Sequence, residues 1–96
     1  MILSFGDPAT EDLYHGRATK RVRRFPPNTI AAALRKLDML AAAHSLADLS
    51  SPPGNRLEAL KGGWEGFHSI RINEQWRIVF RWENNGAKQV AIVDYH

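Results

Sequence analysis

Apolar residues in the middle of the chain recur every three or four positions, which is the period of one face of an α-helix. The stripe starts just after Pro26 and Pro27, where Asn28 or Thr29 offers a capping side chain. A shorter helix is expected between Asp7-Pro8 and Gly16, because proline favours the first helical position and glycine ends helices. The stripe of the longer helix consists of Ile30, Ala33, Leu34, Leu37, Leu40 and Ala41.

The last third of the chain alternates between apolar and polar residues, which is the period of a β-strand. A strand is expected at 76–82, with Arg77, Val79 and Arg81 on the face turned away from the apolar one. Further strands are expected at 1–5, 56–60, 67–73 and 89–93, the last of them after an Asn85-Gly86 hairpin signal. The apolar face of the 76–82 strand consists of Trp76, Ile78, Phe80 and Trp82, which we expect to pack in the core.

The order of these elements predicts the fold class. One strand, two helices and then a meander of strands indicate an α+β fold, in which an N-terminal strand and two helices pack on a mainly antiparallel sheet of four to five strands. The 96 residues are too few for two domains, so residues 1–96 are expected to form one. Residues 44–55, rich in serine, proline and glycine, read as a connector.

The composition of the chain bears on disulfides, membrane segments and metal sites. The chain has no cysteine, so packing has to stabilise its core. It has no apolar run of membrane-spanning length and no signal-peptide pattern, so we expect a cytoplasmic protein without membrane contact. Its histidines lack metal-site spacing such as HExxH, so neither a metal nor another cofactor is expected.

The net charge of +3 is mild, but the positive charges cluster. No acidic residue falls between Gly16 and Phe25, which predicts a dense, unpaired basic segment. Such a segment suits an RNA backbone or an acidic protein partner. The expected RNA- or ribosome-binding residues are Arg17, Lys20, Arg21, Arg23 and Arg24, together with Arg81 from the 76–82 strand.

Several other side chains suit phosphate chemistry. Arg71 and Arg77 are expected on the outer faces of neighbouring strands, where guanidinium groups either bind a phosphate or simply face solvent. Residues 94–96 are an aspartate, a tyrosine and a histidine, and so place an acid, a phenol and an imidazole side by side in the sequence. Such groups can cleave RNA without a metal by moving protons to and from ribose oxygens. His96 is the candidate proton donor. Trp64 and Phe67, beside glycines, either pack in the core or stack on bases.

Three ordered blocks of the chain, 52–62, 69–78 and 93–96, resemble the HigB family of the RelE/ParE toxins, and the segment 22–27 is similar to it as well. The resemblance implies a ribosome-dependent endoribonuclease that cleaves mRNA in the decoding site. It also implies neutralisation by a HigA-type helix-turn-helix antitoxin, through which alone the complex contacts operator DNA. Carried over by position, it implies that Lys61, Arg71 and Arg77 neutralise the phosphate while Asp94, Tyr95 and His96 position groups and transfer protons.

One residue departs from the family pattern. Where some members have a histidine, this chain has Glu58, which can serve as a general base. If Glu58 instead pairs with Arg56 or Lys61, the base stays unassigned. Two other functions fit the same fold: a ParE-like toxin that inhibits DNA gyrase, and a domain that binds RNA or antitoxin without catalysis.

Overall fold

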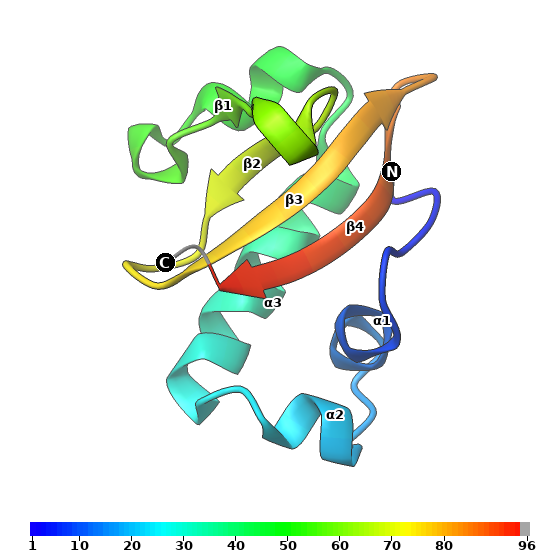
Figure 1. Ribbon diagram of the computed structural model, residues 1–96, viewed down its shortest axis with the longest axis vertical. Helices are drawn as coiled ribbons and strands as arrows, with labels where there is room; N and C mark the ends of the chain where they lie inside the picture. The colour runs from blue at the N-terminus through cyan, green and yellow to red at the C-terminus, as the bar shows by residue number, and fades with distance from the viewer. Residues whose placement is uncertain (95–96) are drawn as a thin grey trace.

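The computed structural model describes residues 1–94, which form three α-helices and a four-stranded antiparallel sheet (Figure 1). The α+β class is therefore as predicted, with one helix more than expected. Short 3-10 turns fill the 44–55 connector and the segment after it. The helices are α1 (Pro8–Tyr14), α2 (Lys20–Arg23) and α3 (Pro27–Ala42), and the 3-10 turns are η1 (Leu46–Ser50), η2 (Pro53–Asn55) and η3 (Gly62–Trp64).

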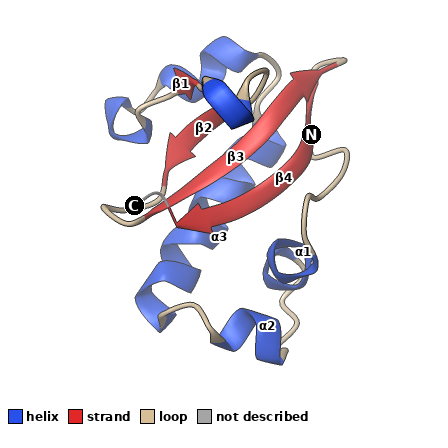
Figure 2. Ribbon diagram, viewed as in Figure 1, coloured by secondary structure: helices blue, strands red, loops and turns tan. Residues whose placement is uncertain are grey.

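The sheet has the strand order β1-β2-β3-β4, so each strand pairs with its neighbour in sequence. α3 passes behind the sheet and contacts β3 and β4, whereas the yellow-green η3 turn stands in front of it (Figures 1 and 2). Of the helices in the described part of the chain, none is both long and apolar enough to cross a membrane. The strands are β1 (Glu58–Ala59), β2 (His68–Arg71), β3 (Trp76–Glu83) and β4 (Gly86–Asp94).

The helix starts follow local chemistry, with one correction. Asp7 caps α1 as expected, since its carboxylate accepts a hydrogen bond from the Thr10 amide at 2.8 Å. The capping role expected of Asn28 or Thr29 is wrong, because α3 begins at Pro27 without a side-chain cap. The Thr29 hydroxyl is buried and instead accepts a hydrogen bond from Asn73 at 3.2 Å, which links α3 to the turn between β2 and β3.

The core lies between α3 and the inner face of the sheet. Ala33, Leu37 and Leu40 of the predicted helical stripe are fully buried, and so are Ile78 and Phe80 of the predicted strand face. The outer face of β3 is not open to solvent as its alternation suggested, because Val79 and Arg77 are buried there too. The middle of β3, from Arg77 to Phe80, is therefore buried on both of its faces.

The N-terminal strand expected at 1–5 is reduced to two isolated parallel bridges, from Ile2 to Ala87 and from Phe5 to Val90. The chain is held there because Gly86 has no side chain: a Cβ atom on it would lie 2.8 Å from Leu3 Cγ. The N-terminal segment thus covers the outer edge of β4.

The hairpin between β3 and β4 forms one residue earlier than its Asn-Gly signal suggested. Its turn residues are Asn84 and Asn85, both with positive φ (51° and 63°), while Gly86 already belongs to β4. A β-bulge follows opposite Phe80, where the register shifts by one residue and Gln89 takes a φ of 54°. The bulge lets β4 turn both Ala87 and Val90 towards the core.

The basic segment is partly neutralised, which corrects the expectation that its charges are unpaired. Asp12, on the preceding helix, forms ion pairs with Arg17 and Arg21, each at 3.2 Å, and accepts a hydrogen bond from Thr19 at 3.0 Å. Burial alone would raise the pKa of Asp12, but the hydrogen bonds from Thr19, Arg17 and Arg21 lower the pKa by more, to below its usual value of 3.8. Asp12 therefore ties α1 to α2.

We expect Asp12→Asn to lower the melting temperature by several degrees at pH 7 and to have a smaller effect near pH 2. Because the pKa of Asp12 is depressed in the folded state, its stabilisation is fully present above the ordinary pKa of 3.8 and is lost as the pH falls through the lower folded value. Thermal unfolding at both pH values measures this, with exposed Asp38→Asn on α3 as the control. An equal loss at both pH values would mean that the carboxylate charge is not what stabilises the link.

Candidate active site

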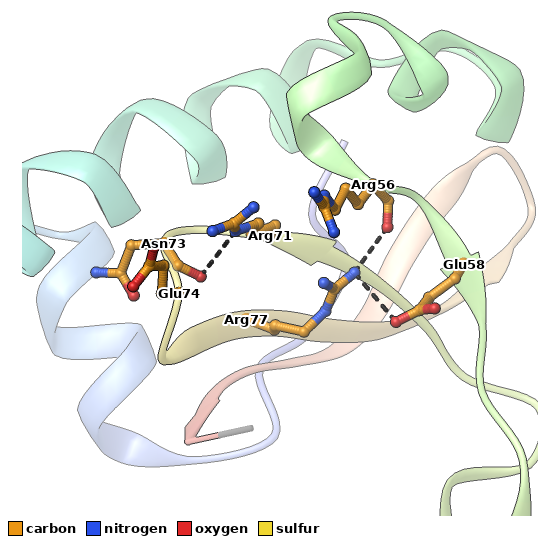
Figure 3. A pocket seen from close by; sticks show the side chains of 6 residues that line it. All are labelled: Arg56, Glu58, Arg71, Asn73, Glu74 and Arg77. Carbon is orange, nitrogen blue, oxygen red and sulfur yellow. Dashed lines mark hydrogen bonds and ion pairs between the residues drawn. The ribbon is translucent and has the colours of Figure 1, made fainter. Parts of the chain in front are cut away.

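A cavity of about 470 Å³ opens on the sheet face turned away from α3 (Figure 3). Strand alternation explains why charged groups meet there, because Arg71 and Arg77 point away from the buried Ile70 and Ile78. The remaining lining residues come from the end of η2, from the first residue of β1 and from the turn after β2. In full, the cavity is lined by Arg56, Glu58, Arg71, Asn73, Glu74 and Arg77.

Arg77 forms the rigid part of this site. It is only 6% exposed, and its Nε donates to Ser69 Oγ at 2.8 Å. Its Nη2 donates to the Arg56 carbonyl oxygen at 2.7 Å and lies 3.4 Å from Glu58 Oε1. The alternative that Arg77 is an ordinary solvent-facing charge is therefore wrong: neighbouring groups orient its guanidinium from several sides, as Figure 3 shows in part.

Arg71 lies directly across the ladder from Arg77. Its Nε donates to the Asn73 carbonyl oxygen at 3.1 Å, which holds the half-buried side chain beside the cavity. Two like charges opposite each other on one sheet face repel. Glu58 offsets part of this repulsion, yet the lining has three arginines against two glutamates. An anion bound between the two arginines would relieve the rest, so the cavity suits a phosphate.

Glu58 forms an ion pair with Arg77. The alternative pairing considered from the sequence, with Arg56 or Lys61, is not found among the described residues. The Glu58 side chain is 47% exposed, so the carboxylate borders both the cavity and solvent. Glu58 reaches this position because β1 pairs with β2 in a register that puts it opposite Ser69, on the same face as Arg77. A carboxylate at the border of a phosphate-sized cavity is a chemical candidate for a proton acceptor.

The structure does not bring all of the predicted site residues to the cavity. Lys61 is exposed at the N-cap of η3 and is not among the lining residues. Asp94 ends β4 opposite Trp76 and accepts a hydrogen bond from Gln75 at 3.0 Å. Tyr95 and His96 lie outside the described residues. The basic residues Arg17, Lys20, Arg21, Arg23 and Arg24 lie in and beside α2.

Sequence reasoning missed four residues of this site: Arg56, Ser69, Asn73 and Glu74. Strand parity was a usable signal for Ser69, which sits two residues before Arg71 on the same face. No local pattern marks Arg56, which enters through a left-handed turn (φ 46°) after η2. Among residues 1–94, no group of three or more His, Cys, Asp or Glu side chains is arranged to hold a metal ion.

The fold is that of the RelE-type toxins. It matches the YoeB–YefM complex from Staphylococcus aureus with a TM-score of 0.61 at 19% sequence identity, covering 100% of this chain and 98% of that one. It matches YafQ from E. coli strain BL21(DE3) with a TM-score of 0.59 at 12% identity, covering 99% and 94%. At these identities the likeness concerns the fold, and it confirms the predicted RelE/ParE-like architecture.

The family model of the HigB-like toxins, described as the RelE-like toxin of the type II toxin-antitoxin system HigB, matches residues 3–96, so the chain belongs to this family. It is 44% identical to Toxin HigB-1 of Vibrio cholerae over 87 residues, or 91% of this chain and 90% of that protein. It is 29% identical to Endoribonuclease HigB of Proteus vulgaris over the full length of both. The predicted toxin family is confirmed, and the predicted endoribonuclease class agrees with the name of this last relative.

Proposed function

We propose that this HigB-type toxin is a metal-independent endoribonuclease that cleaves translated mRNA on the ribosome, and hence acts in the cytoplasm. The observation that carries the proposal is the pair of opposed arginines, Arg71 and Arg77, held on a rigid sheet beside a cavity that a carboxylate also borders. Prearranged donors stabilise the charge that grows on a phosphate in the transition state. The name of the Proteus vulgaris relative supports the same activity.

The reaction needs a base, an acid and cations. The ribose 2′-oxygen attacks the adjacent phosphorus and gives its proton to the base, for which Glu58 is the candidate. The bond from phosphorus to the 5′-oxygen breaks, and the acid, assigned to His96, protonates that oxygen. Asp94 and Tyr95 would help to position these groups, and Lys61 would add positive charge for the phosphate.

As a toxin of a type II system, the protein has an antitoxin partner. We assign this partner to the HigA type, whose helix-turn-helix domain would make the contacts to operator DNA. Lys20, Arg23 and Arg24, exposed in and beside α2, are the cations best able to meet ribosomal RNA or an acidic antitoxin segment, since Asp12 already pairs with the other two.

His96→Gln tests the mechanism. Glutamine keeps hydrogen-bonding capacity but cannot donate a proton as an imidazolium does, so cleavage is expected to fall by about 100-fold or more. The measurement is the rate of mRNA cleavage on programmed ribosomes, with the ends of the products mapped. Antitoxin binding serves as the control and should not change.

If His96→Gln cleaves mRNA as fast as the parent, His96 is not the general acid. The role would then be assigned to Tyr95, or to Asp94 together with Lys61. A parental protein that cleaves no RNA but inhibits DNA gyrase would replace the proposed function by the ParE-like one.

A further inference from the structure

A second group of chemically distinctive side chains lies on the sheet face that carries the cavity. We call Trp64, Phe67 and Arg81 the Trp64 cluster. Trp64 is 43% exposed and meets the Phe67 ring edge-on, with centroids 5.1 Å apart at 80°. The Arg81 guanidinium lies over the Phe67 ring, 4.6 Å from its centroid. The cluster therefore combines an exposed aromatic face with a fixed cation.

The backbone is built to allow this arrangement. Gly66 has a φ of +91°, and a Cβ atom on it would lie 2.7 Å from Arg81 Nη1. Only glycine leaves room for the guanidinium to reach the Phe67 ring at this backbone geometry. Trp64 itself ends the η3 turn, which begins with exposed Gly62 and Gly63 and presents the indole to solvent.

The Trp64 cluster and the cavity are continuous along one strand. Arg81 and Arg77 are four residues apart on β3 and share its outer face, which puts their Cα atoms about 13 Å apart at strand spacing. On β2 the same face runs from Arg71 through Ser69 to Phe67, which adjoins the strand. Lys61, one turn before Trp64, is exposed and adds a second cation to the half-buried Arg81 of the cluster.

We propose that Trp64 is a stacking platform for a nucleobase of the RNA strand whose scissile phosphate lies between Arg71 and Arg77. This inference rests on the proposed function. Exposed aromatic faces interleaved with cations are how proteins hold single-stranded nucleic acid, since every base offers a π-face and every nucleotide a phosphate. RNA is favoured over an apolar protein surface as the occupant, because Arg81 and Lys61 are positively charged. The cluster is also continuous with the cavity that suits a phosphate.

The first test measures binding apart from cleavage. A short single-stranded RNA with 2′-O-methyl groups cannot be cut, because its 2′-oxygens carry no proton to lose. Trp64→Ala is expected to weaken its binding at least about fivefold, while Trp64→Phe keeps most of the affinity. Leu3→Ala, a comparably exposed residue (39%) at the other edge of the sheet, is the control and should bind like the parent.

The second test asks whether a base is the ligand. In a series of the same RNAs, each with one abasic position, one position should weaken binding to the parent but not to Trp64→Ala. On programmed ribosomes, Trp64→Ala should raise KM and leave kcat nearly unchanged, because stacking binds substrate and transition state alike. Thermal unfolding of the exposed Trp64→Ala variant should match that of the parent.

The outcomes separate this inference from the proposed function. If Trp64→Ala keeps parental RNA affinity and KM while Arg77→Ala strongly lowers the rate of cleavage, the stacking platform is wrong and the nuclease function stands. If the parent cleaves no RNA, the proposed nuclease function is wrong. Binding of the abasic RNA series then tests on its own whether Trp64 stacks on a base. If Trp64→Ala loses affinity for the antitoxin but not for RNA, the cluster is a protein contact and the inference is overturned.

Discussion

Arg77→Ala is expected to lower the rate of mRNA cleavage by about 100- to 1,000-fold, the usual effect of removing one oriented donor from a developing negative charge. Arg77 faces the cavity from a strand buried on both sides, and Ser69 and the Arg56 carbonyl hold its guanidinium in place. The measurement is cleavage on programmed ribosomes at saturating toxin, together with growth inhibition in cells.

The burial of Arg77 makes a folding control necessary, because alanine would also leave a hole and an unpartnered Ser69 hydroxyl. Arg77→Met fills more of the space without the charge and should be equally inactive. Arg35→Ala, on the exposed side of α3, removes one positive charge that does not line the cavity and should cleave normally. Full activity in a folded Arg77→Met protein would remove this arginine from the site.

Phe80→Ala is expected to reduce the free energy of unfolding by about 3–5 kcal/mol, which approaches the whole stability of a domain of this size. Phe80 is fully buried and contacts the rings of His68 and Trp82 at centroid distances of 6.2 and 6.5 Å. Urea denaturation measures the loss. Trp76→Ala should cost less, because Trp76 is only half-buried, against the ring of Phe25.

Trp64→Ala is the matched control for this truncation, since it removes a larger aromatic group from an exposed position and should change stability little. Unchanged unfolding of Phe80→Ala would mean that the Phe80 ring does not pack in the core.

The sequence predicted best where one periodic signal agrees with burial. The stripe on α3 and the apolar face of β3 were both found correctly, since a residue such as Leu37 or Phe80 has no other favourable place in so short a chain. The same alternation put Arg77 and Arg71 on the outer face, and the structure brings both to the cavity. These predictions need only the local backbone geometry.

The sequence predicted poorly where contacts cross between elements. The basic segment looked unpaired because no acid lies inside it, yet Asp12 reaches it from the preceding helix. Arg77 was expected to be exposed, but it is buried. The alternation along a strand predicts which face of the sheet a side chain lies on, but not what covers that face. The backbone of Arg56 covers it, after a connector whose path no periodicity specifies.

The pairing of the chain's first residues with its last strand has a consequence for the timing of folding. The Leu3 amide donates to the Ala87 carbonyl at 2.7 Å, and the Ile92 amide donates to the Thr10 hydroxyl at 2.9 Å, 82 residues away in sequence. During synthesis, α1 and the N-terminal segment therefore emerge long before their partners on β4. Because such long-range contacts form only after the chain closes on itself, the sheet and α1 reach their final arrangement only after β4 has been translated.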